Sequence, residues 1–362
     1  MGFQQAGFKI LLGVDIDEKS LLTFQKNFPN TSTLNLDLSD EEGIKKINDS
    51  LGSKKVDVVI AGPPCQGFSL TGPRNFDDKR NKLYLSVIEF VRKNQPKAFL
   101  IENVPGIATL YSGKIRQEIN KRFQNLGYAV NSDVLCAADY GVPQIRKRFF
   151  FVGLKKEYSK YSFPDRTHRP DNYLSCSDAI ADLPPLEDEI GTEISSYSTK
   201  AISPYQKKMR LGSKSLHNHV ATCHTDKVKK VISLVPEGGN YKDLPPGVGE
   251  SRKFNEAWTR YHSKKPARTI DTGHRNHFHY KYNRVPTVRE NARLQSFPDK
   301  FVFLGNRTQQ YRQVGNAVPP ILAENMAKQL LLYLDGELAL KHKNEFSLYR
   351  FINRSRNGAK QV

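Results

Sequence analysis

A cysteine in a stiff loop is the first residue of this sequence that could do chemistry. The apolar run 56–61 leads into Gly62-Pro63-Pro64-Cys65-Gln66-Gly67-Phe68-Ser69, where prolines and glycines surround the thiol. A lone cysteine is most often a small buried apolar residue, but buried cysteines seldom occupy a loop of this composition. We therefore interpret Cys65 as a nucleophile. No histidine is close in sequence to act as its base, so the base would be a spatial neighbour, or a basic environment could activate the thiol instead.

A carboxyl group follows another apolar run. Residues 98–101 are entirely apolar and lead into Glu102, Asn103 and Val104. In open parallel sheets, ligands bind beyond the carboxyl ends of the strands. Because a carboxylate in this position is costly to bury without partners, we expect Glu102 to act as an acid at the same sheet edge as Cys65.

A basic segment, Gln144-Ile145-Arg146-Lys147-Arg148, opens a later apolar run. The two-residue period of a strand puts Gln144, Arg146 and Arg148 on one face. A basic run is most often solvated surface, but at a sheet edge these side chains could bind the phosphate or carbonyl groups of a nucleotide. Asp15 ends the first apolar run, where it could accept ribose hydroxyls or simply belong to a helix cap.

The elements that would position these residues alternate in type. From the N-terminus to about residue 155, short apolar runs alternate with segments of helical length, including a predicted helix over 17–28 with Asp17 as its cap. This alternation predicts the α/β fold class, with a doubly wound, mostly parallel sheet. The predicted strands are 10–14, 56–61, 98–101, 130–135 and 148–152.

The second half of the chain has a different amino-acid composition. Residues 156–304 are rich in Pro, Gly, Ser and Tyr, which predicts a smaller, irregular domain. Residues 320–334 predict a helix that packs on the first domain and ends at Gly336. The apolar stripe of that helix consists of Leu322, Met326, Leu330 and Tyr333. The expected division is 1–155 plus 305–345, then 156–304, then a basic tail over 346–362.

Composition restricts the class of protein. Lys and Arg number 56 against 37 Asp and Glu, a net charge of +19 that favours a polyanionic partner such as nucleic acid. With 38% hydrophobic residues the chain can build a core, which excludes a disordered tail protein. No window approaches the roughly 18 apolar residues of a membrane span, so we expect a cytoplasmic protein without membrane association. The four cysteines are far apart, which argues against a disulfide scaffold and a zinc ribbon.

Five sequence blocks, taken together and in order, resemble the DNA cytosine-5 methyltransferases of bacterial restriction-modification systems. The blocks span most of the chain, and their number and order make the resemblance specific. They are residues 62–69, 102–104, 144–148, 287–298 and 313–320.

The resemblance implies transfer of a methyl group from S-adenosylmethionine to carbon 5 of cytosine, at a specific sequence in double-stranded DNA. Because carbon 5 is a poor nucleophile, Cys65 would first add to carbon 6 while Glu102 protonates or hydrogen-bonds ring nitrogen 3. Arg146 and Arg148 would hold the cytosine carbonyl and a nearby phosphate. The target base would have to be flipped out of the duplex. The sheet would be of the S-adenosylmethionine-dependent methyltransferase type.

The resemblance also implies residues for the cofactor and for DNA. Asp15 would meet the ribose, Ile16 and Leu38 the adenine, and Asp37 its amino group. The methionine part would lie among Pro63, Leu83, Asn316 and Ala317. Residues 156–304 would form a target recognition domain. The expected DNA contacts are Ser69, Gln144, Arg260, Arg268, Thr269, Ile270 and the region around Arg275.

Two histidine-rich clusters invite a metal interpretation. Their spacings do not match a usual zinc site, so we predict no metal and favour DNA-contacting loops. The clusters are His217, His219, Cys223 and His224, and His274, His277 and His279. Arg289 and Arg293 share one helix face, and we expect them to pair with acids such as Glu290 and Asp299 rather than to act in catalysis.

One part of the family pattern is absent. The family opens with a strand and the glycine-rich turn Asp-Leu-Phe-x-Gly-x-Gly-Gly, whereas this sequence starts within the next segment, at Met1-Gly2-Phe3. Loss of that strand would remove the pairing partner of two neighbours. A start codon placed too late is the favoured explanation. The alternatives are an inactive, truncated remnant and a split enzyme whose partner chain supplies the strand.

Other function classes stay open. A remnant that has lost catalysis could still bind DNA without methylating it. An RNA cytosine methyltransferase uses the same chemistry, but the long segment between Arg148 and Thr287 favours a protein that reads DNA. A cysteine hydrolase would need a histidine near Cys65. We expect a monomer, and a cognate restriction endonuclease would act separately.

Overall fold

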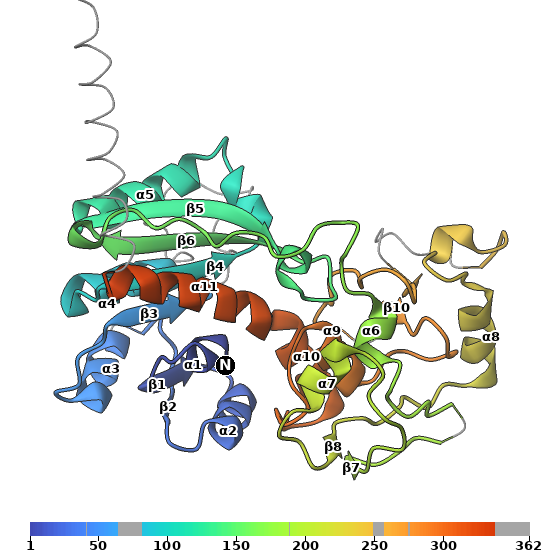
Figure 1. The fold of residues 1–362 in the computed structure, drawn as a ribbon. Helices are drawn as coiled ribbons and strands as arrows, with labels where there is room; N and C mark the ends of the chain where they lie inside the picture. Colours follow the sequence, from blue (N-terminus) through green and yellow to red (C-terminus); the bar gives the residue numbers. More distant parts are fainter. Residues whose placement is uncertain (41, 64–81, 188, 249–256, 274–275, 337–362) are drawn as a thin grey trace, which may run out of the picture. The chain divides into compact units, whose positions relative to one another are not determined.

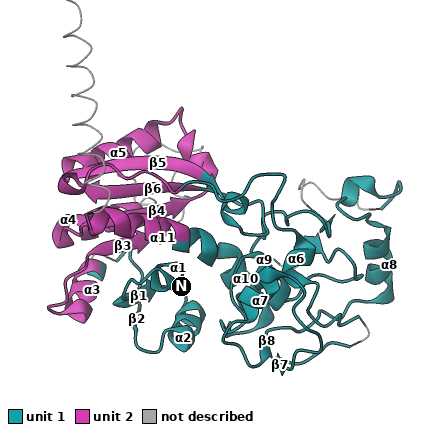
Figure 2. Ribbon diagram, viewed as in Figure 1, with its two compact units in different colours: residues 1–43, 135–148, 165–324 teal, residues 44–134, 149–164, 325–362 magenta. Residues whose placement is uncertain are grey.

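The computed structural model describes residues 1–362 except 41, 64–81, 188, 249–256, 274–275 and 337–362 (Figure 1). Cys65, Ser69, His274, Arg275 and the predicted basic tail therefore lie outside the described residues. The chain divides into two compact units (Figure 2). Unit 1 comprises residues 1–43, 135–148 and 165–324, and unit 2 comprises 44–134, 149–164 and 325–362. Unit 1 thus combines the N-terminal segment with 165–324; the domain boundaries expected from the sequence stay a prediction.

Unit 2 is built on a four-stranded sheet with the order β3-β4-β6-β5 (Figure 1). β3 and β4 are parallel, and β6 runs antiparallel to β4. The bounds are β3 Val58–Ala61, β4 Ala98–Asn103, β5 Tyr128–Cys136 and β6 Lys147–Lys155. The helices that follow these strands or precede them are α3 Gly43–Leu51, α4 Lys82–Asn94 and α5 Lys114–Asn125. The four sequence-predicted strands in this region are therefore confirmed, with shifts of a few residues at their ends.

The core of unit 2 explains why β4 is so apolar. Ala98, Phe99, Leu100 and Ile101 are each at most 4% exposed, because helices and strands cover both faces of the strand. Phe99 stacks on Phe123 of α5 with ring centroids 3.9 Å apart. On the neighbouring strand, a Cβ at Gly153 would lie 2.1 Å from the Phe99 ring, so only glycine fits there.

Unit 1 contains a second, two-stranded parallel sheet. β1 (Leu12–Asp15) pairs with β2 (Ser32–Asn35), and α2 (Glu18–Asn27) connects them. Asp17 caps α2 by accepting a hydrogen bond from the Lys19 amide at 3.3 Å, which confirms the predicted helix. β2 was not predicted, because its residues are polar or partly exposed and show no apolar run. In the described residues, the strands of the expected single sheet form two groups: the parallel pair β1-β2, and the four-stranded sheet, in which β3 and β4 are parallel and β6 is antiparallel to β4.

The remainder of unit 1 consists of short elements, as the Pro- and Gly-rich sequence predicts. Two pairs of two-residue strands and several helices of five to ten residues are joined by long connections. The helices of unit 1 outside α2 are α1 Gly2–Gln5, α6 Cys176–Ile180, α7 Pro204–Arg210, α8 Asp226–Leu234, α9 Val288–Leu294 and α10 Arg307–Asn316. The short strands are β7 Ile194–Ser195, β8 Leu216–His217, β9 Thr259–Arg260 and β10 His277–Phe278.

The last described helix, α11, spans Pro320–Leu334 and confirms the sequence prediction. All four residues of its apolar stripe are at most 1% exposed. Within unit 2, Tyr161 donates a hydrogen bond to the Met326 carbonyl at 3.2 Å, and the Tyr333 hydroxyl accepts one from the Ser162 amide at 2.9 Å.

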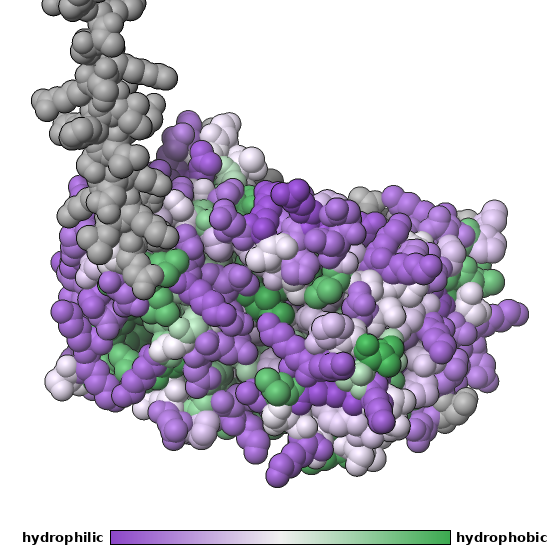
Figure 3. All heavy atoms as spheres, viewed as in Figure 1, coloured by the Kyte–Doolittle hydropathy of each residue, from purple (hydrophilic) through white to green (hydrophobic). Residues whose placement is uncertain are grey.

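In the part of the chain that the structure describes, no helix is long and apolar enough to cross a membrane. Hydrophilic side chains cover most of the face seen in Figure 3.

Candidate active site

The carboxyl ends of β3 and β4 are adjacent. The two parallel strands pair Ala61 with Ile101, so Gly62 and Glu102 are the next residues at the same edge of the sheet. A Cβ built on Gly62 would lie 3.6 Å from Glu102 Oε2. The carboxylate of the half-buried Glu102 therefore lies against the backbone that continues to Cys65.

Asn103 joins these two strand ends. Its Nδ2 donates hydrogen bonds to the Pro63 carbonyl and to the Tyr84 hydroxyl, both at 3.0 Å. Its Oδ1 accepts one from the Val104 amide at 2.8 Å. Asn103 is 4% exposed and Tyr84 is 1% exposed. Neither was predicted to have a role; the available signal was a polar side chain directly after a wholly apolar strand.

Arg146 and Arg148 have different environments. Arg146 is 1% exposed, and its guanidinium donates to the Ile270 carbonyl at 3.1 Å and to the Gly315 carbonyl at 2.7 Å. It thus joins three segments of unit 1 that are far apart in sequence. Arg148 is half-buried and donates to the Lys147 carbonyl at 2.8 Å. Their contact with a nucleotide stays a prediction.

Gln144 and Ile270 are buried within unit 1, and their contact with DNA stays a prediction. Gln144 is fully buried, donates to Gln295 and to the Leu294 carbonyl, and accepts from the Ile270 amide at 3.1 Å. Ile270 is 1% exposed. Both polar ends of Gln144 thus form hydrogen bonds inside the protein.

The other predicted DNA contacts in the irregular region fall into two classes. Arg260 is 6% exposed, and its guanidinium donates to the carbonyls of Ile232 and His279 and to Asn283 Oδ1; its contact with DNA stays a prediction. Arg268 and Thr269 are exposed. Thr269 donates to the Ile145 carbonyl at 2.9 Å, which places it beside the basic segment.

The edge of the two-stranded sheet gathers the residues expected at the adenosine. β1 and β2 pair Asp15 with Asn35, and Asn35 Nδ2 donates to the Ile16 carbonyl at 2.9 Å. Asp15 is exposed, and Ile16 is 66% exposed. Shortly after β2 come the exposed Asp37 and the half-buried Leu38. Carboxylates and apolar side chains at one edge are a suitable set for a nucleoside.

The residues expected at the methionine part belong to both units. In unit 1, Asn316 ends α10 and is exposed, and the carbonyl of Ala317 accepts a hydrogen bond from Gln295. In unit 2, Pro63 is buried and Leu83 is half-buried. Their assignment to one cofactor stays a prediction.

Two histidines of these clusters, His219 and His279, form hydrogen bonds with other protein groups. His219 contacts Thr287 Oγ1 through Nδ1 and the Pro184 carbonyl through Nε2, both at 2.9 Å. His279 Nδ1 accepts from the amides of Lys281 and Tyr282. Over the described ranges, no group of three His, Cys, Asp or Glu side chains is placed to hold a metal ion.

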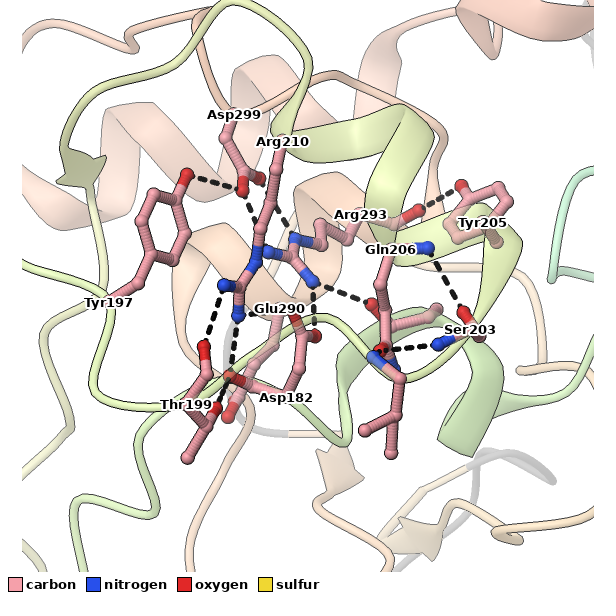
Figure 4. Close-up of polar contacts among 12 residues, drawn as sticks. Asp182, Tyr197, Thr199, Ser203, Tyr205, Gln206, Arg210, Glu290, Arg293 and Asp299 are labelled. Atoms are coloured by element: carbon pink, nitrogen blue, oxygen red, sulfur yellow. Dashed lines mark hydrogen bonds and ion pairs between the residues drawn. The ribbon is translucent and has the colours of Figure 1, made fainter.

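A buried ionic network organises α9 (Figure 4). Arg293 forms a two-point ion pair with Asp299 and a further one with Asp182, which also pairs with Arg210. The expected pairing of Arg293 with Asp299 is confirmed.

The other two charged residues of this helix differ from expectation. Glu290 pairs with Arg284 at 2.7 Å rather than with Arg289 or Arg293. Arg289 binds mainly main-chain carbonyls, at His217, Pro298 and Phe301. Its nearest acid is Asp299, at 3.9 Å.

Comparison with known proteins identifies the family to which this arrangement belongs. The profile of the family described as C-5 cytosine-specific DNA methylase matches residues 1–332. The chain belongs to this family. Type II methyltransferase M1.HphI of Haemophilus parahaemolyticus is 42% identical over 342 residues, covering 91% of this chain and 83% of that protein. Type II methyltransferase M.DdeI of Desulfomicrobium norvegicum is 35% identical over 380 residues, covering 98% and 90%.

Solved structures agree with the sequence comparison. A DNA modification methyltransferase encoded within a prophage of E. coli matches this DNA methylase with a TM-score of 0.75 and 28% identity, covering 92% of this chain and 95% of that chain. Dnmt2 of Spodoptera frugiperda, at 16% identity and a TM-score of 0.55, shares the fold. The protein is therefore an α/β DNA cytosine-5 methyltransferase of the restriction-modification type, and the alternative of a binding protein without activity is not favoured.

Proposed function

We propose that Cys65 and Glu102 act together on a cytosine at the carboxyl ends of β3 and β4. The observation that supports this is the position of the Glu102 carboxylate against Gly62. Cys65 is three residues beyond Gly62, and three residues of chain span at most about 11 Å. This short connection is compatible with both side chains acting on one cytosine ring.

The chemistry begins with the cysteine. The thiolate of Cys65 adds to carbon 6, and the electron pair of the 5,6 double bond makes carbon 5 nucleophilic. Glu102 stabilises the adduct by protonating or hydrogen-bonding ring nitrogen 3, a general-acid contribution of about a hundredfold or more. S-adenosylmethionine, when bound, supplies the methyl group that is transferred to carbon 5. Loss of the proton on carbon 5 then restores the double bond and expels Cys65.

We propose that the adenosine part of the cofactor binds at the edge of the two-stranded sheet. Asp15 would accept hydrogen bonds from the ribose, and Asp37 from the adenine amino group. Ile16 and Leu38 would cover the faces of the adenine ring. Because an isoleucine that is 66% exposed gains when apolar surface covers it, this edge fits an adenosine. Pro63, Leu83, Asn316 and Ala317 are proposed around the methionine part.

DNA recognition is proposed for the exposed part of the irregular region. Arg268 and Thr269 are exposed beside the basic segment, and we propose that they contact the duplex, together with Ser69. Arg146 and Arg148 would hold the flipped base and its phosphate. The net charge of +19 favours binding to the phosphates of the DNA backbone. The protein would work in the cytoplasm as a monomer, with a cognate restriction endonuclease acting separately.

Transfer of labelled methyl from S-adenosylmethionine to unmethylated DNA tests the proposal. We expect transfer by the wild-type chain, none by Cys65→Ser, and a loss of about a hundredfold or more in Glu102→Gln. Glu118→Gln is a matched control, since Glu118 is a surface carboxylate of unit 2 that pairs with Arg122 at 2.8 Å. Full transfer by Cys65→Ser would rule out the proposed nucleophile. DNA binding without transfer, by this chain and by one extended upstream in frame, would favour the catalytically silent alternative.

A further inference from the structure

We infer that Asn103 and Tyr84 are positioning residues that hold the chain leading to Cys65 in place against Glu102. The inference rests on the proposed roles of Cys65 and Glu102, and it adds two buried residues that the proposed mechanism does not use.

The carboxamide of Asn103 is held in one orientation. Both its nitrogen and its oxygen are engaged, by Pro63 and Tyr84 on one side and by the Val104 amide on the other. A buried amide whose donor and acceptor are both satisfied cannot rotate without leaving polar groups unpaired. Asn103 is therefore a fixed point at the end of β4.

Pro63 can be held in few other ways. Proline has no N–H, so its carbonyl is its only main-chain group that can form a hydrogen bond. That carbonyl is the one that Asn103 binds, across 40 residues of sequence. The contact fixes the peptide two residues before Cys65.

Tyr84 supplies the second anchor. Its ring lies in the core of unit 2 with Val87 and Val91 of the same helix, so its hydroxyl is presented from a rigid support. The chain continues beyond Pro63 and enters α4 at Lys82, two residues before Tyr84. One amide group therefore binds residues on both sides of the Cys65 segment.

Addition of the thiol to carbon 6 requires the Cys65 side chain to be positioned precisely. The thiol must reach carbon 6 while Glu102 meets nitrogen 3, and a displacement of about 1 Å at such a centre can cost about a hundredfold in rate. Asn103 directly follows Glu102 in β4. The same strand end thus sets the position of the acid and of the chain that carries the nucleophile.

The test separates binding from the covalent step. Full-length wild-type, Asn103→Ala and Tyr84→Phe chains are incubated with S-adenosylmethionine and DNA from cells grown with 5-azacytidine. Where azacytosine occupies the target position of a recognition site, it traps the attacking thiol. The readouts are the rate of the denaturation-resistant adduct at saturating DNA and the DNA concentration that gives half of that rate. We expect the saturating rate to fall about tenfold in Asn103→Ala and about threefold in Tyr84→Phe, with the half-saturating concentration unchanged within about twofold.

Tyr128→Phe is the matched control. Tyr128 lies in the same core as Tyr84, is fully buried, and donates to the Pro96 carbonyl at 2.6 Å. Its loss removes a comparable hydroxyl away from the carboxyl ends of β3 and β4, so the adduct should form at the wild-type rate. Because Tyr84→Phe keeps the ring, it decides the question even where Asn103→Ala fails to fold.

Two results would overturn the inference. Equal rates for Tyr84→Phe and Tyr128→Phe would show that the Tyr84 hydroxyl has no special part in the covalent step. A raised half-saturating concentration with an unchanged saturating rate would assign these residues to DNA binding. A wild-type chain that forms no adduct would instead overturn the proposed function, and the inference with it.

Discussion

Arg293 and Asp299 form a two-point ion pair with no solvent exposure of either side chain. Nε and Nη2 of the arginine donate to the two carboxylate oxygens at 2.9 and 2.7 Å. Tyr197 adds a hydrogen bond to the same carboxylate at 2.7 Å. Burial alone would raise the pKa of Asp299, but hydrogen bonds from Arg293 and its charge keep that pKa below the ordinary value. Each charge is thus tolerated only because the other is present.

We expect Arg293→Met to destabilise the protein severely. The substitution would leave Asp299 and Asp182 buried without their shared cation, and breaking a buried pair in this way costs about 3–5 kcal/mol. Urea unfolding of the full chain measures the loss. Arg92→Met is the control, because the Arg92–Glu89 pair is largely exposed and surface pairs contribute about 0–1 kcal/mol. Similar losses in both variants would contradict the prediction.

Stability should fall in mild acid because of buried histidines. Burial lowers the pKa of His279 to about 3 and also lowers that of His219. The unfolded chain, with histidine pKa values of about 6.5, therefore binds more protons than the native state below that pH. The stability that depends on an uncharged His279 is fully present above about pH 6.5 and is lost as the pH falls toward 3.

Unfolding at pH 7.5, 6.5 and 5.5 checks this dependence. Below its unfolded pKa, one histidine with a depressed native pKa contributes a slope of up to about 1.4 kcal/mol per pH unit. His279→Gln should flatten the slope by up to that amount. An unchanged slope in the variant would exclude His279 as a source of the acid sensitivity.

Ile16→Ala should weaken binding of S-adenosylmethionine about tenfold without loss of stability. Ile16 is 66% exposed, so the folded chain gains little from its side chain, whereas a bound adenine would bury it. Isothermal titration calorimetry measures the affinity. Ile194→Ala is a close control because Ile194 is 62% exposed in the same unit. Equal affinities in the two variants would remove Ile16 from the cofactor site.

Arg268→Ala should weaken DNA binding and reduce its salt dependence. Loss of one phosphate contact lowers the slope of log affinity against log salt concentration by about 1. Fluorescence anisotropy over a series of salt concentrations gives that slope. The control is Arg116→Ala, which removes an exposed arginine from α5. A slope equal to that of the wild type would show that Arg268 contacts no phosphate.

Local sequence patterns were sufficient to predict many of the helices and strands. The spacing of Leu322, Met326 and Leu330 predicted α11, because a helix places such residues on one face whatever surrounds it. Asp17 likewise marked the start of α2, since a cap acts on amides two or three residues away. β2 was missed because it carries no such pattern, and its existence depends on pairing with β1.

The candidate functional residues show the same division between sequence and structure. The amino-acid sequence by itself determined the family, the candidate nucleophile and acid, and the strands that carry them, because these depend on residue type and order. Only the tertiary structure decided that Gln144 and Arg260 face inward, since their partners lie up to 151 and 28 residues away. It also decided that Asn103 binds Pro63, a contact across 40 residues. The burial of a polar group depends on acceptors that the folded chain brings to it, and no local pattern encodes them.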